Sequence, residues 1–150
     1  MILALTLTLG CTYEHATRSG PLSGLSDSLF PDSVQLKCRQ ADILLPTESA
    51  YRTCAATDTS AQWMDIARTG LVLGIVVNWA DDSVGQIKAH ALAEHFTAIS
   101  GAEPRPGEAD ATEEETSWTS DSVCYGLFRA FQHRGYQAVW YLSERYGHCG

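Results

Sequence analysis

The side chains of this chain that could serve in catalysis or metal binding are those of its histidines, cysteines and acidic residues. They form no recognisable motif, because the sequence lacks a G-x-S-x-G turn, a P-loop, an H-E-x-x-H zinc sequence and an EF-hand loop. His90 and His95 are five positions apart, which separates them by about 140° around a helix. They cannot face one metal ion together, and we expect no metal and no cofactor.

Two histidines are the remaining candidates for a small catalytic site. His95 falls within the apolar face of a predicted helix, where a hydrogen-bonded core histidine is the simpler interpretation. His148 precedes Cys149, but neighbouring residues on a strand point to opposite faces, which disfavours a Cys–His nucleophile. The run Glu113-Glu114-Glu115 has the oxygens that Ca²⁺ prefers without the spacing of a calcium loop, so we interpret it as a solvated charge run.

Apart from Cys11, the chain has four cysteines, and their spacing favours disulfides over a zinc site. They are Cys38, Cys54, Cys124 and Cys149. No pair has the C-x-x-C spacing of zinc ligands, and an even number of cysteines in an exported protein is typical of disulfide bonding. Cys38–Cys54 is the simplest pair, since it closes a short loop. Cys124–Cys149 would follow by elimination.

The second pairing conflicts with a hairpin predicted over residues 123–142. Pairing about its turn places Cys149 about five residues from the position opposite Cys124, roughly 16 Å along a strand and beyond disulfide reach. Three explanations stay open: the tail after Gly147 folds back, Cys124 pairs elsewhere, or residues 122–132 are helical. For residues 122–132 we favour the strand.

The chain begins with the uncharged apolar run MILALTLTLGC, followed by a stretch rich in Ser, Gly and Thr. Residues 2–9 are too few for a membrane-spanning helix, which needs about 20 residues, but they suit the hydrophobic region of a signal peptide. Leu7-Thr8-Leu9-Gly10-Cys11 resembles the lipobox of bacterial lipoproteins. The resemblance implies that Cys11 is lipidated and that the protein lies in the bacterial cell envelope, on its periplasmic or extracellular side. A cleaved signal without lipid and a buried N-terminal strand are the alternatives.

The charge of the chain limits the classes of partner that it can bind. The formal net charge is −8, and nucleic-acid binding depends on Lys and Arg that neutralise phosphates. We therefore expect no nucleic acid, a membrane contact only through the lipid anchor, and a protein partner. The chain divides into a signal peptide (1–10), a flexible tether (11–32) and one domain (33–150).

The first half of the domain is predicted to consist of short strands. Residues 33–38 alternate apolar and polar side chains, and residues 41–45 continue this strand after a kink. Residues 46–54 are predicted to form a turn or a short helix. Residues 61–68 and 71–79 are predicted to pair as an antiparallel hairpin, the second of them as a central strand.

One long helix is predicted over residues 83–100. Asp81-Asp82-Ser83 offers an N-cap, Ser83 with Gln86 fits a capping box, and Gly101 supplies the C-terminal stop. The apolar side chains gather on one side at 100° per residue, and we expect that side to pack on the sheet. Its members are Val84, Ile87, Ala91, Leu92, His95, Phe96 and Ile99.

The last third combines an acidic loop with aromatic strands. Residues 102–116 hold six acidic residues and two prolines, which indicates a surface loop. Residues 123–131 and 138–142 alternate as the strands of a second hairpin. If the helix covers one face of the sheet, Trp140 or Tyr141 is exposed on the other as a partner surface.

These patterns predict an α+β domain, an antiparallel sheet of four to five strands with one main helix packed on one face. We expect a non-catalytic envelope lipoprotein that acts as a binding or accessory subunit of a membrane-associated complex through its sheet face or acidic loop. The alternative is a small envelope enzyme that uses His95 or His148 with a nearby carboxylate.

Overall fold

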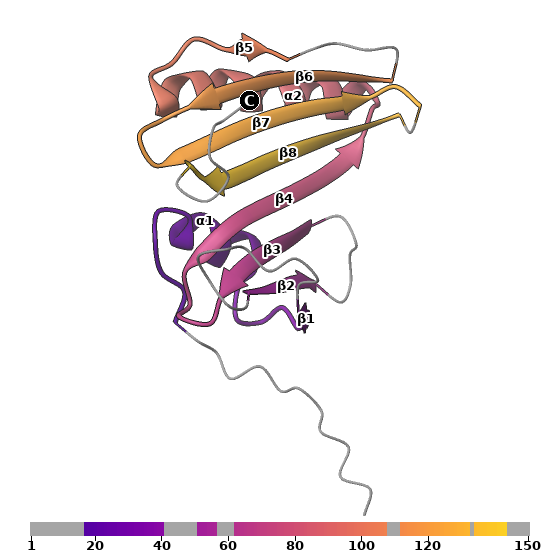
Figure 1. The fold of residues 1–150 in the computed structure, drawn as a ribbon. Coiled ribbons are helices and arrows are strands. Elements are labelled where there is room, and N and C mark those ends of the chain that lie inside the picture. The colour runs from indigo at the N-terminus through magenta and orange to yellow at the C-terminus, as the bar shows by residue number, and fades with distance from the viewer. Residues whose placement is uncertain (1–16, 41–50, 57–61, 108–111, 133, 144–150) are drawn as a thin grey trace, which may run out of the picture.

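The computed structural model describes residues 17–40, 51–56, 62–107, 112–132 and 134–143. Within them, eight strands form one sheet in the order β1-β2-β3-β4-β8-β7-β6-β5, and all neighbouring strands are antiparallel (Figure 1). The strands are β1 Leu36–Gln40, β2 Tyr51–Ala56, β3 Gln62–Ala67, β4 Val72–Ala80, β5 Arg105–Pro106, β6 Glu113–Thr119, β7 Val123–Ala130 and β8 Gly135–Leu142, and the helices are α1 Ser23–Leu29 and α2 Ser83–Ser100.

The predicted fold class, with four to five strands and one main helix, is therefore wrong. Three strands were not predicted. β2 replaces the turn or short helix expected over residues 46–54. β5 lies within the predicted acidic loop over residues 102–116, and β6 begins within it. The glutamates that open β6 have low strand propensity, but β6 pairs with β7 along its whole length. Tertiary pairing has overridden local preference here.

Several predicted elements are confirmed. β3 and β4 pair as an antiparallel hairpin around Gly70, and residues 123–130 form the strand β7 rather than a helix. α2 has the predicted bounds. The carboxylate of Asp82, rather than Ser83, caps it by accepting a hydrogen bond from the Gly85 amide at 2.7 Å, and Gly101 ends it in the left-handed conformation with φ 64°.

The centre of the core is a row of side chains that crosses seven strands on one face of the sheet. The register aligns it from β1 to β6, and all of its members except Cys38 are buried. Phe96 of α2 inserts between the aromatic members, with ring centres 5.1–5.3 Å from each. The row consists of Cys38, Cys54, Met64, Ile75, Trp140, Tyr125 and Trp118.

A disulfide joins Cys38 and Cys54 directly across β1 and β2, with 4.0 Å between the Cα atoms. This pairing is the one predicted. Cys124 is also disulfide-bonded, and its partner lies outside the described residues. Cys11 and Cys149 lie there as well.

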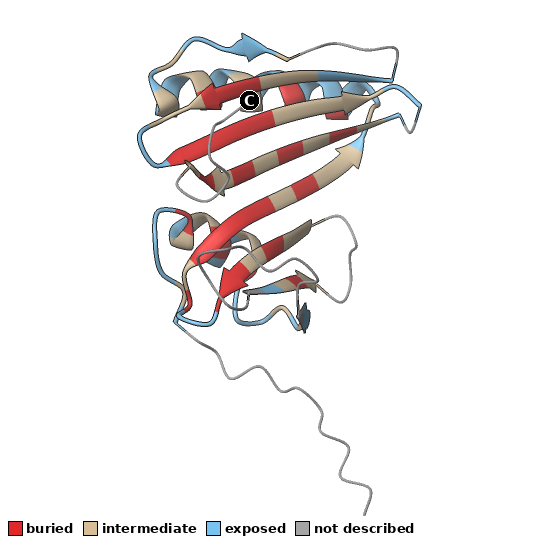
Figure 2. Cartoon of the chain, in the orientation of Figure 1, coloured by how far each residue is buried: buried red, intermediate tan, exposed pale blue. Residues whose placement is uncertain are grey.

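The face of α2 that packs on the sheet is only partly the predicted one, since it shares Leu92 and Phe96 with it. Val84 and Ile87 are 72% and 71% exposed, whereas Gly85, Ala89 and Phe96 are buried. A Cβ atom on Gly85 would lie 1.9 Å from the Ala80 carbonyl oxygen, so the glycine lets the helix start close to the end of β4. Close approach of small residues and the insertion of Phe96 fix the rotation of α2, and the helix shows both buried and exposed segments in Figure 2.

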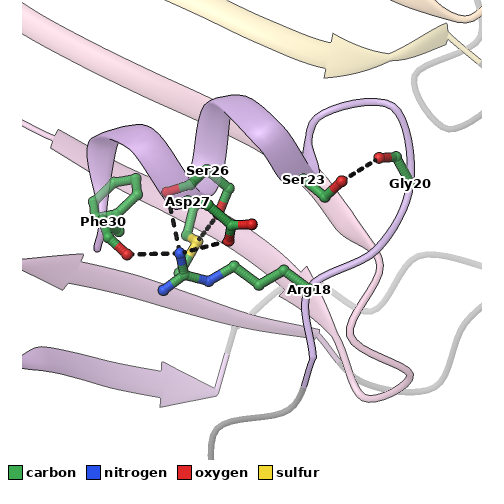
Figure 3. A network of polar contacts seen from close by, with 7 residues as sticks. Arg18, Gly20, Ser23, Ser26, Asp27 and Phe30 are labelled. Carbon is green, nitrogen blue, oxygen red and sulfur yellow. Dashed lines mark hydrogen bonds and ion pairs between the residues drawn. The ribbon is translucent and has the colours of Figure 1, made fainter. Parts of the chain in front are cut away.

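Part of the predicted flexible tether is ordered. Within residues 11–32, α1 packs against the sheet, with Leu22 and Phe30 almost fully buried. Arg18 fixes this segment: its Nη1 donates hydrogen bonds to the carbonyl oxygens of Ser26 (3.1 Å) and Phe30 (2.6 Å), and it pairs with Asp27 at 3.2 Å (Figure 3). A cation at the C-terminal carbonyls of a helix satisfies groups that otherwise lack partners. The tether prediction is therefore wrong for residues 22–30.

Replacing Arg18 with methionine is expected to destabilise the fold by about 2 kcal/mol, because hydrogen bonds from a charged donor to buried carbonyls are lost while the aliphatic packing is kept. Urea unfolding measures this change. Asp27→Asn is the matched control. Asp27 is 66% exposed, and its ion pair with Arg18 contributes less than the two hydrogen bonds from Arg18 to the carbonyl oxygens. Equal stability of the Arg18→Met variant and the unmodified chain would contradict the role assigned to Arg18.

Candidate functional site

The two helices lie on the same face of the sheet. Phe96 of α2 packs on Trp140, and Ser26 of α1 donates its hydroxyl to the Met64 sulfur at 3.2 Å; Met64 and Trp140 belong to one cross-strand row. Figure 1 shows both helices behind the sheet. Among the described elements, the opposite face carries no helix, and we call it the open face.

The open face holds a half-buried apolar strip across its centre. Trp63, Val76 and Val139 are cross-strand neighbours on β3, β4 and β8, and each is one residue out of step with the core row. Beside this strip, a Cβ atom on Gly126 would lie 2.8 Å from both Phe128 and Val139, so the missing side chain makes room for these two. An apolar strip on a sheet face that carries no described helix is typical of an interaction surface.

A groove of about 560 Å³ lies on the open face over β1, β2 and β3. The register places its side chains in two rows, Lys37–Ala55–Trp63 and Arg39–Thr53–Asp65. The middle strand contributes the small residues Ala55 and Thr53, while the strands on either side contribute the large ones. The groove, which we call the β2 trough, therefore follows from one strand of small side chains between two strands of large ones.

The two walls of the β2 trough differ in chemistry. Lys37 and Arg39 form one wall; both are exposed, and no hydrogen bond or ion pair joins either to another described residue. Trp63 and Asp65 form the other wall, where the Thr53 hydroxyl donates a 2.6 Å hydrogen bond to the Asp65 carboxylate. This arrangement can bind an anionic group beside a flat apolar one.

The structure places the two residues of the predicted partner surface on opposite faces of the sheet. Trp140 is 8% exposed and packs beneath Phe96, so it belongs to the core. Tyr141 points to the open face and is half-buried. Burial raises the pKa of Tyr141 above its ordinary value, and the nearby negative charge of Glu115 raises it further.

Of the two candidate catalytic histidines, the structure describes only His95. His95 is exposed on α2, on the helix side of the sheet, and its ring centre lies 6.4 Å from that of Phe96. His90 pairs with Glu94 at 3.5 Å on the exposed surface of the same helix. His148 lies outside the described residues.

A second polar cluster fixes the start of α2. Arg129 donates to Asp81 at 2.9 Å, Gln86 donates to Asp81 at 3.1 Å, and Trp79 stacks on Tyr136 with ring centres 5.6 Å apart. The hydrogen bond from Arg129 is the main cause of a lowered pKa at Asp81, and burial raises the pKa of Tyr136. Because its members bind one another, we assign this cluster a structural role.

The lowered pKa of Asp81 predicts a pH-dependent contribution to stability. Its folded-state pKa lies below the ordinary 3.8, so the stabilisation is present above that value and is lost as the pH falls through the folded-state pKa. Asp81→Asn should therefore destabilise the chain at neutral pH, and the difference from the unmodified chain should shrink in acid. Urea unfolding over a pH series tests this, with the exposed Glu103→Gln as control. A difference that does not change with pH would contradict it.

The β2 trough was not predicted from the sequence. The segment around Lys37, Cys38 and Arg39 does carry one signal, since two cations flank a cysteine in an alternating strand and must share the face opposite to it. The sequence alone did not place Trp63 beside these cations, because the segment that forms β2 was predicted to be a turn or a helix. Without β2, the register that aligns the two walls does not exist.

No protein-family model, curated protein or solved structure matches this chain. Within the described residues, no helix is long and apolar enough to cross a membrane. The same residues contain no cluster of three or more His, Cys, Asp or Glu side chains suited to a metal ion.

Proposed function

We propose that this chain is a non-catalytic binding protein of the bacterial envelope, anchored by lipid at Cys11, that binds its partner on the open face of the sheet. The observation that carries this proposal is the one-sided fold. Both helices cover the core face, while the open face combines the apolar strip Trp63–Val76–Val139 with the β2 trough. Apolar area with a few polar groups around it is the usual composition of a binding surface.

The enzyme alternative gains no support from the described residues. His95 sits on α2 away from the trough, and Asp65, the carboxylate of the trough, accepts a hydrogen bond from Thr53. A general base must lie within hydrogen-bonding reach of its substrate proton, and no described histidine shares the open face with that carboxylate.

The order of residues 17–30 sharpens the anchor proposal. Ser19 bridges to Leu71, so the start of the described chain is fixed beside the turn between β3 and β4. Five residues lie between Cys11 and Thr17, and the six Cα-to-Cα steps span roughly 20 Å at full extension. Lipid on Cys11 would then hold the end of the sheet near Gly70 close to the membrane surface.

The anchor is tested by labelling with fatty acid in a bacterial host. The unmodified chain should incorporate the label and partition with membranes, and Cys11→Ser should abolish both. Membrane association should persist at high salt, because stably anchored lipoproteins carry more than one acyl chain. Labelling that survives the Cys11→Ser change would overturn the anchor.

The binding face is tested by co-purification from native membranes with two matched variants. Val139→Lys places a charge in the apolar strip of the open face, and Ile87→Lys places the same charge on the exposed side of α2. We expect Val139→Lys to lose the partner and Ile87→Lys to retain it, with thermal unfolding confirming that both are folded. Loss with Ile87→Lys alone would transfer the binding site to α2.

A further inference from the structure

We propose that the β2 trough is a binding site for an acidic saccharide, a chain of sugar rings that carry carboxylates. This inference rests on the proposed function, because it assigns a ligand class to part of the open face. It is argued from the shape of the trough, from the cations of one wall and from the composition of the other.

The shape of the trough suits a single extended chain. Its walls stand on β1 and β3, which are two strand spacings apart, or about 9.5 Å. Ala55 and Thr53 on β2 leave the floor low between them. The volume of about 560 Å³ falls within the range of small-ligand sites. A row of single sugar rings fits such a channel, whereas a helix, about 10 Å or more in diameter, does not.

The β1 wall supplies two cations along the direction of the trough. Lys37 and Arg39 are two residues apart on one strand, so their Cα atoms lie roughly 6.8 Å apart on the same face. The guanidinium group of Arg39 can bind a carboxylate through two parallel hydrogen bonds. In a chain with net charge −8, these cations give the trough a local charge opposite to that of the protein, which favours an anionic ligand at this place.

The β3 wall distinguishes a saccharide from other anions. The half-buried Trp63 offers flat apolar surface against which a sugar ring can stack. Asp65, which already accepts the Thr53 hydroxyl, is an acceptor whose carboxylate oxygens suit the hydroxyl groups of a sugar. A glutamate peptide satisfies the cations of the β1 wall but has no ring to stack on Trp63.

The test is titration calorimetry of the full chain with three probes. These are an oligomer of galacturonic acid, the neutral galactose oligomer of equal length, and a glutamate peptide of equal charge. We expect the galacturonate oligomer to bind, and the other two to bind about tenfold or more weakly. Equal binding of the neutral oligomer, preference for the peptide, or no binding of galacturonate would each overturn the assignment.

Charge-matched variants locate the binding. Arg39→Gln should weaken galacturonate binding by about tenfold or more, in line with the loss of a charge-assisted hydrogen bond. Arg105→Gln is the control, because the register places Arg105 on the same face at the far edge of the sheet. Equal losses in both variants would show non-specific attraction and contradict the site. If galacturonate fails while Val139→Lys still loses the native partner, only the ligand assignment is wrong; if both fail, the proposed function is wrong as well.

Discussion

Replacing Phe96 with alanine is expected to lower the free energy of unfolding by about 3–5 kcal/mol. Phe96 is fully buried, and its ring contacts Trp118, Tyr125 and Trp140, which come from three different strands. Truncation removes the contacts that the Phe96 ring makes with all three of these rings, and it leaves a cavity between α2 and the sheet. The loss is large because helix packing, rather than helix propensity, holds α2 in place.

Urea unfolding measures this change, and Ile87→Ala on the same helix is the matched control. Ile87 is 71% exposed, so its truncation should alter stability by less than about 0.5 kcal/mol. The pair of variants also decides which side of α2 faces the core. A large loss for Ile87→Ala and a small one for Phe96→Ala would contradict the packing described above.

Removing the Cys38–Cys54 disulfide is expected to cost about 3 kcal/mol, as the chain-entropy model gives for a loop of this length. β1 is an edge strand that pairs only with β2 among the described strands, so the cross-link holds the cationic wall of the trough in register. The same change should therefore weaken ligand binding in the trough as well as stability.

The double variant Cys38→Ala/Cys54→Ala is preferable to chemical reduction, because Cys124 is also in a disulfide that reduction would open. Thermal or urea unfolding gives the stability change. Hydrogen exchange should show that amides of β1 lose protection before those of β4, which lies in the middle of the sheet. An unchanged midpoint together with unchanged protection of β1 would contradict this role for the bond.

Local signals sufficed for the elements that have strong periodicity and clear ends. The hairpin of β3 and β4 has apolar strands around Gly70, and α2 has a cap at Asp82 and a stop at Gly101. Each of these features acts over a few residues, so the sequence alone predicts them. The disulfide between Cys38 and Cys54 was predicted for the same reason, since it closes a short loop.

Features that depend on distant residues were missed. β6 begins with three glutamates and forms because β7 pairs with it, and β2 forms between β1 and β3. The packing face of α2 was partly mistaken because Gly85 and Ala89 add little hydrophobicity, yet their small size permits close approach to the sheet. The trough combines three strands through their register, which no single segment of sequence contains.

In the proposed function, the lipid anchor and the open face have complementary roles. Lipid at Cys11 would fix where the protein lies, and the short distance to Thr17 would keep the sheet near the membrane. The negative net charge opposes non-specific attachment to anionic lipid, so under the proposal the partner is bound through local features of the open face. The apolar strip and the cationic wall of the trough are those features.

Site-specific photo-crosslinking in native membranes tests the use of the open face most directly. A photoreactive side chain is placed at Val76, in the apolar strip, and in a separate variant at Ile87 on the exposed side of α2. The proposal predicts a discrete crosslinked product from position 76 and none from position 87. A product from position 87 with none from position 76 would contradict the open face as the binding surface.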